Sequence, residues 1–174
     1  SADLASTSAG KGSDTVGFPD ALAPAFLKTT SDIINGERVS VLRAVDKSKW
    51  AGVRAGADTS DLAPDINALL SAMGSAGYGN LYFPAGSYGL GAEITAPSNV
   101  VIEGVRGKTW LFPLYDPAGG NLLLSTSYTS FVTIKGMGFD GKMATRSAAN
   151  FPNVVTVFKA SDVVLEDCNW KDCK

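Results

Sequence analysis

The chain has 174 residues, of which 45% are hydrophobic and 18% charged, and its formal net charge is −2. This suits a globular domain with a core, or a small module followed by the beginning of a larger one, and it excludes a disordered chain. With this net charge the chain lacks the excess of basic residues that is typical of nucleic-acid binding. No apolar run approaches the roughly 20 residues that cross a bilayer. Histidine is absent, which excludes His-based catalytic triads, His metal sites and histidine pH switches.

Residues 1–45 are expected to form an anchoring arm followed by a short β segment. Residues 1–12 have no periodic apolar pattern, and Thr15-Val16-Gly17-Phe18 is the first apolar cluster. Composition alone leaves open a disordered end or an arm that orders against a partner. Asn35-Gly36, followed by the alternating Val39, Val41 and Arg43, predicts a hairpin or a strand–turn–strand.

Residues 46–79 are expected to form a linker and a capping helix. Residues 46–50 read as a polar loop, and the only convincing helix covers residues 59–73. Pro64 suits the first turn, and Gly74 and Gly77 mark the end. The possible N-caps are Thr59, Ser60 and Asp61, and the apolar stripe is Ile66, Leu69, Leu70 and Met73. A lone helix with one apolar stripe should cover unpaired strand edges at the end of an apolar stack.

From residue 80 to residue 174, short strand signals alternate with turns rich in glycine and proline. The expected strands lie at residues 81–83, 87–90, 93–95, 100–102, 109–112, 122–124, 132–134, 154–158 and 163–165. Three short strands in about 31 residues fit a three-sided coil. The competing structure is an antiparallel β-sandwich with strands at similar spacing.

A seven-residue pattern returns three times in this region, at residues 98–104, 130–136 and 161–167. The copies are offset by 32 and 31 residues (130 − 98 and 161 − 130). Each reads Ser, a variable residue, Val, a β-former, Ile or Leu, a charge and a turn residue. A fixed period with strand-type alternation indicates stacked units, none of which buries its apolar face alone. It therefore favours a parallel β-helix, because a sandwich has no reason to repeat one face at a fixed period.

Two segments resemble the start of the pectate-lyase-like right-handed β-helices. Phe83-Pro84-Ala85-Gly86-Ser87-Tyr88 is similar to their Phe-Pro-x-Gly-x-Tyr turn, which follows a capping helix and a glycine-rich loop; residues 66–73 and 74–79 stand in that order here. Residues 98–104 look like the next family element, Ser-Asn-Val-x-Ile-x-Gly. The resemblance implies the same fold for residues 80–174, with further turns beyond residue 174.

Segments upstream narrow the resemblance to bacteriophage tailspikes. Residues 37–43, 51–56 and 59–61 are similar to the segment that joins anchor and helix in those proteins. The opening Ala2-Asp3-Leu4-Ala5, with Val16-Gly17-Phe18, resembles their N-terminal arm. The usual Gly-Asp-Gly-x-x-Asp-Asp tract is kept only in part, at residues 56–61.

The resemblance implies the N-terminal part of a tailspike, or receptor-binding tail protein, of this superfamily. The fold class is then mainly β: an N-terminal anchoring arm with short strands, one capping α-helix, then the first turns of a right-handed parallel β-helix. The implied protein is a homotrimer of the virion tail, made in the host cytoplasm. It holds phage tail or baseplate proteins by its arm and adheres to a bacterial surface polysaccharide, which many family members depolymerise.

Nucleic acid, membrane insertion and cofactors are not expected. The alternative is a secreted or virion polysaccharide lyase or glycoside hydrolase whose active site lies in or just beyond these turns. Whether the full-length protein is an enzyme is left open, and this chain alone is expected to be inactive.

Glycoside hydrolysis needs two carboxylates that face one groove, about 5 to 10 Å apart. The carboxylates of the coil region are Glu93, Glu103, Asp116, Asp140, Asp162, Glu166, Asp167 and Asp172. Glu103, Lys135 and Glu166 share one repeat position, which predicts a solvated salt-bridged ladder. Asp140-Gly141 reads as a turn. Since active sites of the family usually lie on middle turns or between subunits, no catalytic residue is assigned.

Aromatic and sulfur side chains give two further expectations. Trp110, Tyr115 and Trp170 could stack on sugars, but aromatic residues of a β-helix more often belong to the core. Cys168 and Cys173 match no strong zinc spacing and have no other ligand cluster, so no metal site is predicted. Cys168 falls on the apolar position of the repeat and is expected to pack, and Cys173 is expected to be a loop thiol.

Overall fold

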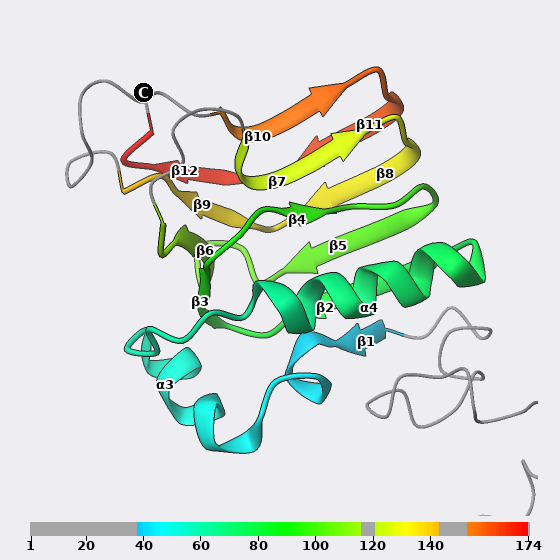
Figure 1. Cartoon of the computed structure of the whole chain (residues 1–174). Coiled ribbons are helices and arrows are strands. Elements are labelled where there is room, and N and C mark those ends of the chain that lie inside the picture. The colour runs from blue at the N-terminus through cyan, green and yellow to red at the C-terminus, as the bar shows by residue number, and fades with distance from the viewer. Residues whose placement is uncertain (1–37, 116–120, 143–152, 174) are drawn as a thin grey trace, which may run out of the picture.

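The structure is a computed structural model that describes residues 38–115, 121–142 and 153–173 (Figure 1). The predicted N-terminal arm, the Asn35-Gly36 turn and Asp116 lie outside the described residues. No helix in the described ranges is long and apolar enough to cross a membrane.

The described residues form short helices followed by a long series of short strands. The helices are η2 (Val41–Arg43), η3 (Lys47–Lys49), α3 (Trp50–Ala55) and α4 (Ala63–Ala76). The strands are β1 (Arg38–Ser40), β2 (Gly79–Phe83), β3 (Gly86–Leu90), β4 (Ile94–Thr95), β5 (Val100–Gly104), β6 (Thr109–Pro113), β7 (Asn121–Ser127), β8 (Ser130–Lys135), β9 (Gly138–Asp140), β10 (Asn153–Phe158), β11 (Ser161–Glu166) and β12 (Asn169–Lys171).

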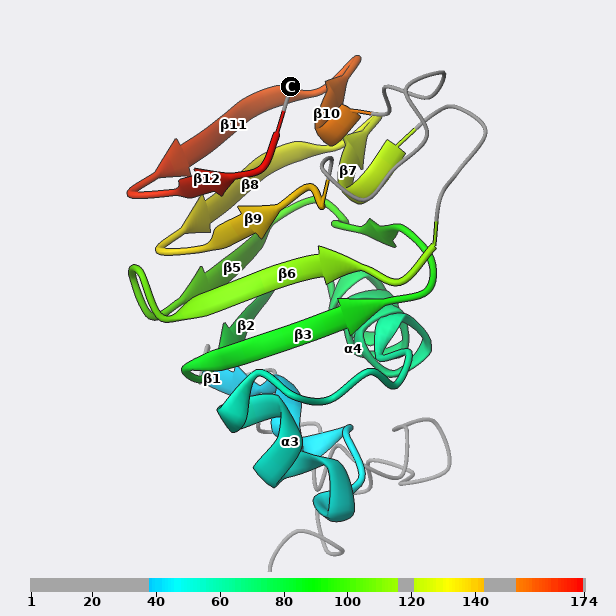
Figure 2. The ribbon, with the colours of Figure 1, turned by 90° about the vertical axis from the view of Figure 1, so that its left-hand side faces the viewer.

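The strands make three parallel sheets, and each turn of the chain adds one strand to each sheet in succession. Sheet A has the order β1-β2-β5-β8-β11, sheet B β3-β6-β9-β12, and sheet C β4-β7-β10. Figure 2 looks onto sheet B, whose four strands follow one another along the stack. Every recorded strand pair is parallel, which rules out the antiparallel sandwich. The predicted fold class is confirmed: a mainly β chain that builds the first turns of a right-handed parallel β-helix.

The seven-residue repeat is in register across sheet A. Ile102 lies opposite Ile134, and Ile134 lies opposite Leu165. Ile102 and Ile134 are fully buried, so the repeated Ile is a stacked core position. The repeated serines also form a column: the Ser130 N–H donates to Ser98 Oγ (3.1 Å), and the Ser161 hydroxyl donates to Ser130 Oγ (2.9 Å). The period of the repeat therefore reflects two features of each coil: the stacked Ile position in the core, and the serine at or just before the start of the sheet-A strand.

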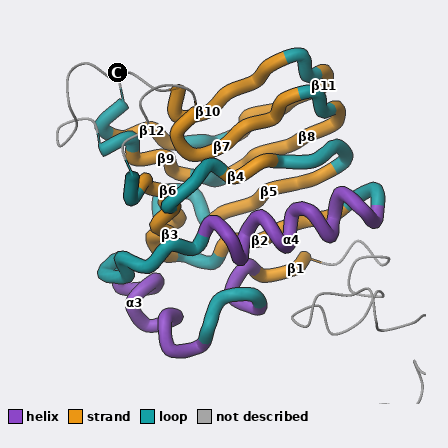
Figure 3. Tube along the Cα trace, in the orientation of Figure 1, coloured by secondary structure: helices purple, strands orange, loops and turns teal. Residues whose placement is uncertain are grey.

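Helix α4 covers one end of the stack, as Figure 3 shows. It buries Ala63, Ile66, Leu69, Leu70 and Met73, which include the whole predicted stripe. The helix begins at Ala63, later than predicted, because the carboxylate of Asp61 accepts hydrogen bonds from the N–H groups of Ala63 (2.9 Å) and Gly91 (2.6 Å). It ends at Gly77, whose φ of 85° favours glycine.

On the N-terminal side, the first coil strand of each sheet meets a different partner. In sheet A, β1 pairs with β2 and is itself the edge strand. In sheet B, the Leu62 N–H donates to Gly89 O (3.0 Å). In sheet C, the side-chain amide of Asn67 donates to Glu93 O (3.0 Å) and accepts from the Thr95 N–H (3.1 Å). Because open edges invite pairing with other chains, these contacts act as an end cap.

Several local predictions differ from the structure. The predicted strand after Asn35-Gly36 stops at Ser40, where the Ser40 hydroxyl accepts from the Leu42 N–H (3.3 Å) and starts η2. Strand β1 pairs in parallel with β2. The predicted loop at residues 46–50 instead contains η3 and the start of α3, so α4 is not the only helix. Helix α3 has six residues and buries only Val53, too few for an apolar period.

Candidate functional site

The outer face of sheet B displays two aromatic rings. Along β6 the burial alternates, so that Trp110 and Phe112 are partly exposed between buried neighbours. Trp110 lies opposite Gly138 on β9, and a Cβ at Gly138 would come within 2.6 Å of the indole ring. Glycine is required there because the ring rests directly on the backbone of the next strand.

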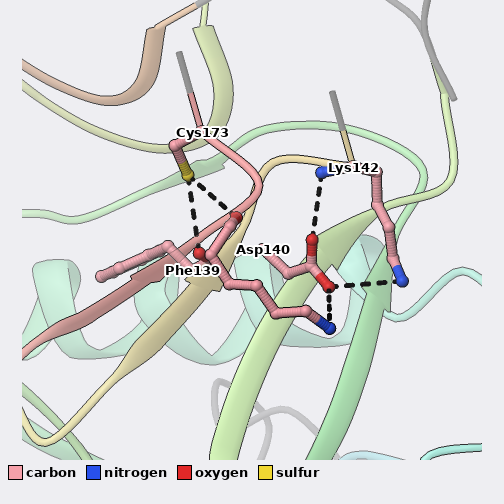
Figure 4. Close-up of polar contacts among 5 residues, drawn as sticks. Phe139, Asp140, Lys142 and Cys173 are labelled. Carbon is pink, nitrogen blue, oxygen red and sulfur yellow. Dashed lines mark hydrogen bonds and ion pairs between the residues drawn. The ribbon is translucent and has the colours of Figure 1, made fainter. Parts of the chain in front are cut away.

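Beside these rings, one buried carboxylate is held by two lysines (Figure 4). The side chain of Asp140 is only 8% exposed, and its Oδ2 lies 3.3 Å from Lys142 Nζ and 3.4 Å from Lys171 Nζ. Its Oδ1 accepts the Lys142 backbone N–H at 3.1 Å. A carboxylate this buried is costly unless it is paired, and here two ammonium groups and one amide satisfy it.

The aromatic and ionic groups form one continuous surface. Lys142 Nζ lies 5.5 Å from the centroid of the Phe112 ring, and Asp140 and Lys171 are neighbours in the register of β9 and β12. The sheet-B surface is defined here as Trp110, Phe112, Asp140, Lys142 and Lys171. Aromatic faces pack on the apolar faces of sugar rings, and ammonium groups donate hydrogen bonds to hydroxyls and carboxylates. The surface therefore suits a polyhydroxylated ligand.

The Asp140-Gly141 pair predicts a turn, and this local pattern does not link Asp140 with the two lysines. The signal was nevertheless present, because Lys171 follows Asp140 by 31 residues (171 − 140), the same offset as between the second and third repeats. Residues one repeat apart lie side by side on adjacent turns, as β9 and β12 do here. Applying the period to charged positions as well as apolar ones would have brought Asp140 and Lys171 together.

The other carboxylates lie away from Asp140 or in backbone turns. Glu103 is on sheet A, where it pairs with Arg38 (3.0 Å) and Lys135 (3.7 Å), and Glu166 follows Lys135 in register. The predicted ladder is thus ion-paired between Glu103 and Lys135, with Arg38 as an added member, and Glu166 continues it in register. Asp162, Asp167 and Asp172 have φ of 53°, 51° and 48°, and Asp167 pairs with Arg106 at 3.2 Å. Glu93 contributes its backbone carbonyl to the Asn67 contact.

The predicted sugar-stacking residues separate into two groups. Tyr115 packs against the core. Trp170, although 50% exposed in the last described turn, stacks on the buried Phe139 ring with centroids 4.9 Å apart. Trp110 is the one that faces outward on sheet B.

Both cysteines are free thiols that pack beside the core. Burial raises the pKa of the Cys168 thiol, in keeping with its apolar repeat position. Cys173 also touches the core, with its Sγ 3.6 Å from Phe139 O, so it is not simply a loop thiol. Within the described ranges no group of three or more potential metal-ligating side chains occurs.

No protein-family model matches the chain, and the comparison with curated proteins finds no significant match. Among solved structures, the chain is similar to the A-module of the mannuronan C-5 epimerase AlgE4 of Azotobacter vinelandii. The TM-score is 0.61 at 19% identity, over 79% of this chain and 39% of that one. It is also similar to ORF18 of Geobacillus virus E2, with a TM-score of 0.56 at 21% identity, over 82% of this chain and 27% of that one.

These similarities establish the fold, the right-handed parallel β-helix. One of the two proteins is named for its action on mannuronan, and the other is a viral gene product. The present chain spans less than half the length of either.

Proposed function

We propose that this chain is the N-terminal part of a phage tailspike whose β-helix binds a bacterial surface polysaccharide. The observation that carries the proposal is the sheet-B surface, where Trp110 lies over Gly138 beside the paired Asp140 carboxylate. The phage origin is supported by the tailspike-like residues 37–61 and by the fold shared with a viral gene product.

A parallel sheet is a suitable support for a polymeric ligand. Its turns repeat every 4.7 to 4.9 Å or so, and its outer side chains stand in regular columns. The polysaccharide would run across these columns, with one sugar face on Trp110 and polar groups near Lys171. In the proposed assembly the protein is a homotrimer, and residues 1–45 hold the phage tail.

Affinity electrophoresis in gels cast with single polysaccharides tests this function. The panel contains bacterial capsular and O-antigen polysaccharides and polymannuronate. We expect at least one to retard the chain, and Trp110→Ala to weaken that retardation about tenfold, roughly the effect of 1.4 kcal/mol. Tyr82→Ala, which removes a partly exposed ring from sheet A, is the matched control.

Two results would contradict the proposal. One is a wild-type chain that migrates unchanged in every gel, and the other is a Trp110→Ala variant that is retarded as strongly as wild type. A loss of equal size in Tyr82→Ala would place the contact on sheet A instead.

A depolymerising enzyme is the second candidate. Its candidate residue is Asp140, because this carboxylate lies on the same sheet as the two outward-facing rings. Hydrolysis needs a second carboxylate facing the same groove, and Glu103 and Glu166 lie on sheet A. We expect residues 1–174 to release neither reducing ends nor unsaturated uronates from the polysaccharide they bind. Release that Asp140→Asn abolishes would place the active site in this chain.

A further inference from the structure

Two aromatic residues have positive φ where β7 leads into β8: Tyr128 in the turn, and Phe131 as the second residue of β8. Tyr128 has φ 56° and is 70% exposed, and Phe131 has φ 58° and is 62% exposed. Positive φ is sterically unfavourable for bulky residues, because the Cβ approaches the following carbonyl oxygen. Burial does not repay this cost, because both side chains lie mostly in solvent.

The fold requires positive φ at these places, but it does not require aromatic residues. The position of Phe131 is occupied by Asn99 (φ 58°) in the preceding repeat and by Asp162 (φ 53°) in the following one. Asn and Asp are the non-glycine residues that adopt this conformation most readily. Phe131 therefore departs from what its backbone favours, and such departures occur preferentially at functional sites.

The next turn of the coil completes an aromatic group at this edge. The Tyr128 N–H donates to Phe158 O (2.9 Å), and the two rings meet edge to face with centroids 5.7 Å apart. Lys159 Nζ lies 5.3 Å from each of these two ring centroids. Figure 1 shows the β10–β11 turn stacked on the β7–β8 turn. The aromatic corner is defined as Tyr128, Phe131, Phe158 and Lys159.

We propose that the aromatic corner is a second saccharide-binding site, distinct from the sheet-B surface. The exposed rings pack on the apolar faces of pyranose units, and the Lys159 ammonium donates a hydrogen bond to a hydroxyl or carboxylate of the same polysaccharide. This inference rests on the proposed function, which supplies the polysaccharide.

Size favours a sugar chain over a protein partner at this corner. A stable protein interface buries about 800 Å² on each side, from some 20–30 residues. The corner has four side chains, which match a few sugar units. The Tyr128 and Phe158 rings are also held against each other before any ligand arrives, which lowers the entropy lost on binding.

The test replaces each strained aromatic residue with the type that its backbone favours. Tyr128→Asn and Phe131→Asn, singly and together, are compared with wild type in affinity gels containing the polysaccharide that retards the wild-type chain. We expect the double variant to bind at least fivefold more weakly, with an unchanged or higher Tm because strain is relieved. Asp162→Asn changes the equivalent position of the next turn without removing a ring, and it should bind like wild type.

The possible outcomes separate the two proposals. If wild type and the double variant bind equally while Trp110→Ala binds weakly, the corner is not a saccharide site and the proposed function stands. If wild type binds none of the polysaccharides, the proposed function fails and this inference fails with it. A lowered Tm, or unchanged binding with a smaller mass in sedimentation, would show that the aromatic residues serve packing or subunit contact instead.

Discussion

Single residues explain why the Phe-Pro-Ala-Gly-Ser-Tyr segment makes a tight turn. The rings of Phe83 and Tyr88 are fully buried and meet edge to face, with centroids 5.1 Å apart. The Tyr88 hydroxyl closes the turn by donating to Pro84 O at 2.8 Å. Gly86 admits helix α3, because a Cβ there would lie 2.8 Å from Val53 O. The motif thus packs the first turn of the coil closely against helix α3.

Tyr88 also makes stability depend on alkaline pH. Burial raises the pKa of its hydroxyl far above the ordinary value of 10.0, so the folded chain keeps a proton that the unfolded chain releases. The unfolded state then binds fewer protons above about pH 10, and the free energy of unfolding falls as pH rises.

Urea unfolding between pH 7 and 11 measures this effect. Tyr88→Phe should cost about 1 kcal/mol at pH 7, from the lost hydrogen bond, and should show a shallower alkaline decline than wild type. Parallel declines in the two proteins would mean that Tyr88 ionises as easily in the folded state as in the unfolded one.

At the scale of elements, helix α4 contributes both apolar surface and polar pairing. Its stripe covers the core, and Asn67 on an adjacent face supplies the donor and acceptor that a neighbouring strand would supply to β4. Strand β4 has only two residues, so these contacts are a large share of its pairing.

Asn67→Ala tests the edge cap. It removes both contacts with β4 and should lower the free energy of unfolding by about 1–2 kcal/mol. Ser71→Ala, one turn further along α4 on an exposed position, should change it by less than about 0.5 kcal/mol. Equal effects of the two changes in chemical denaturation would show that Asn67 does not hold the edge.

The elements also show where sequence reasoning succeeds. The predicted strands from residue 81 onward all correspond to strands, since the period and the alternation reflect the same stacked core. Strands β9 and β12 are absent from the predicted set, because each holds a single apolar residue between polar or glycine neighbours and shows no apolar alternation. The start of α4 depends on Asp61 meeting Gly91, a contact that no local pattern states, whereas Gly77 marks its end in the sequence as in the structure.

At the scale of the whole molecule, stability comes from a core that continues from turn to turn. In the turn furthest from the helices, Leu165 lies in register with the buried Ile134 but is itself exposed. Ile134 is therefore a more informative position than Leu165 for testing the stack.

Ile134→Asp should unfold the coil, because it places a charge in the stacked core, at a cost of several kcal/mol. Thr133→Asp, the neighbouring partly buried position on sheet A, should leave the fold intact. Circular dichroism melting compares the two. An Ile134→Asp protein that keeps the wild-type Tm would show that this residue does not face the core.

The candidate sites were less predictable than the fold because they depend on side chains from different turns. The sequence marks Trp110 as a possible sugar contact, but the place of its ring over the next strand depends on Gly138, 28 residues later (138 − 110). The aromatic corner was missed, since its interest lies in the positive φ of Tyr128 and Phe131, which sequence patterns do not reveal for aromatic residues.

The most direct test of polysaccharide binding at the sheet-B surface is the NMR signal of the Trp110 indole N–H during titration with oligosaccharide of the bound polymer. The three tryptophans give three such signals, assigned by single Trp→Phe variants. Trp50 is the internal control, because its indole donates to Val45 O (2.9 Å) at the capped end. We predict that the Trp110 signal shifts in a saturable manner while the Trp50 signal stays constant. A Trp110 signal that does not move while the sugar binds would contradict a glycan site on sheet B.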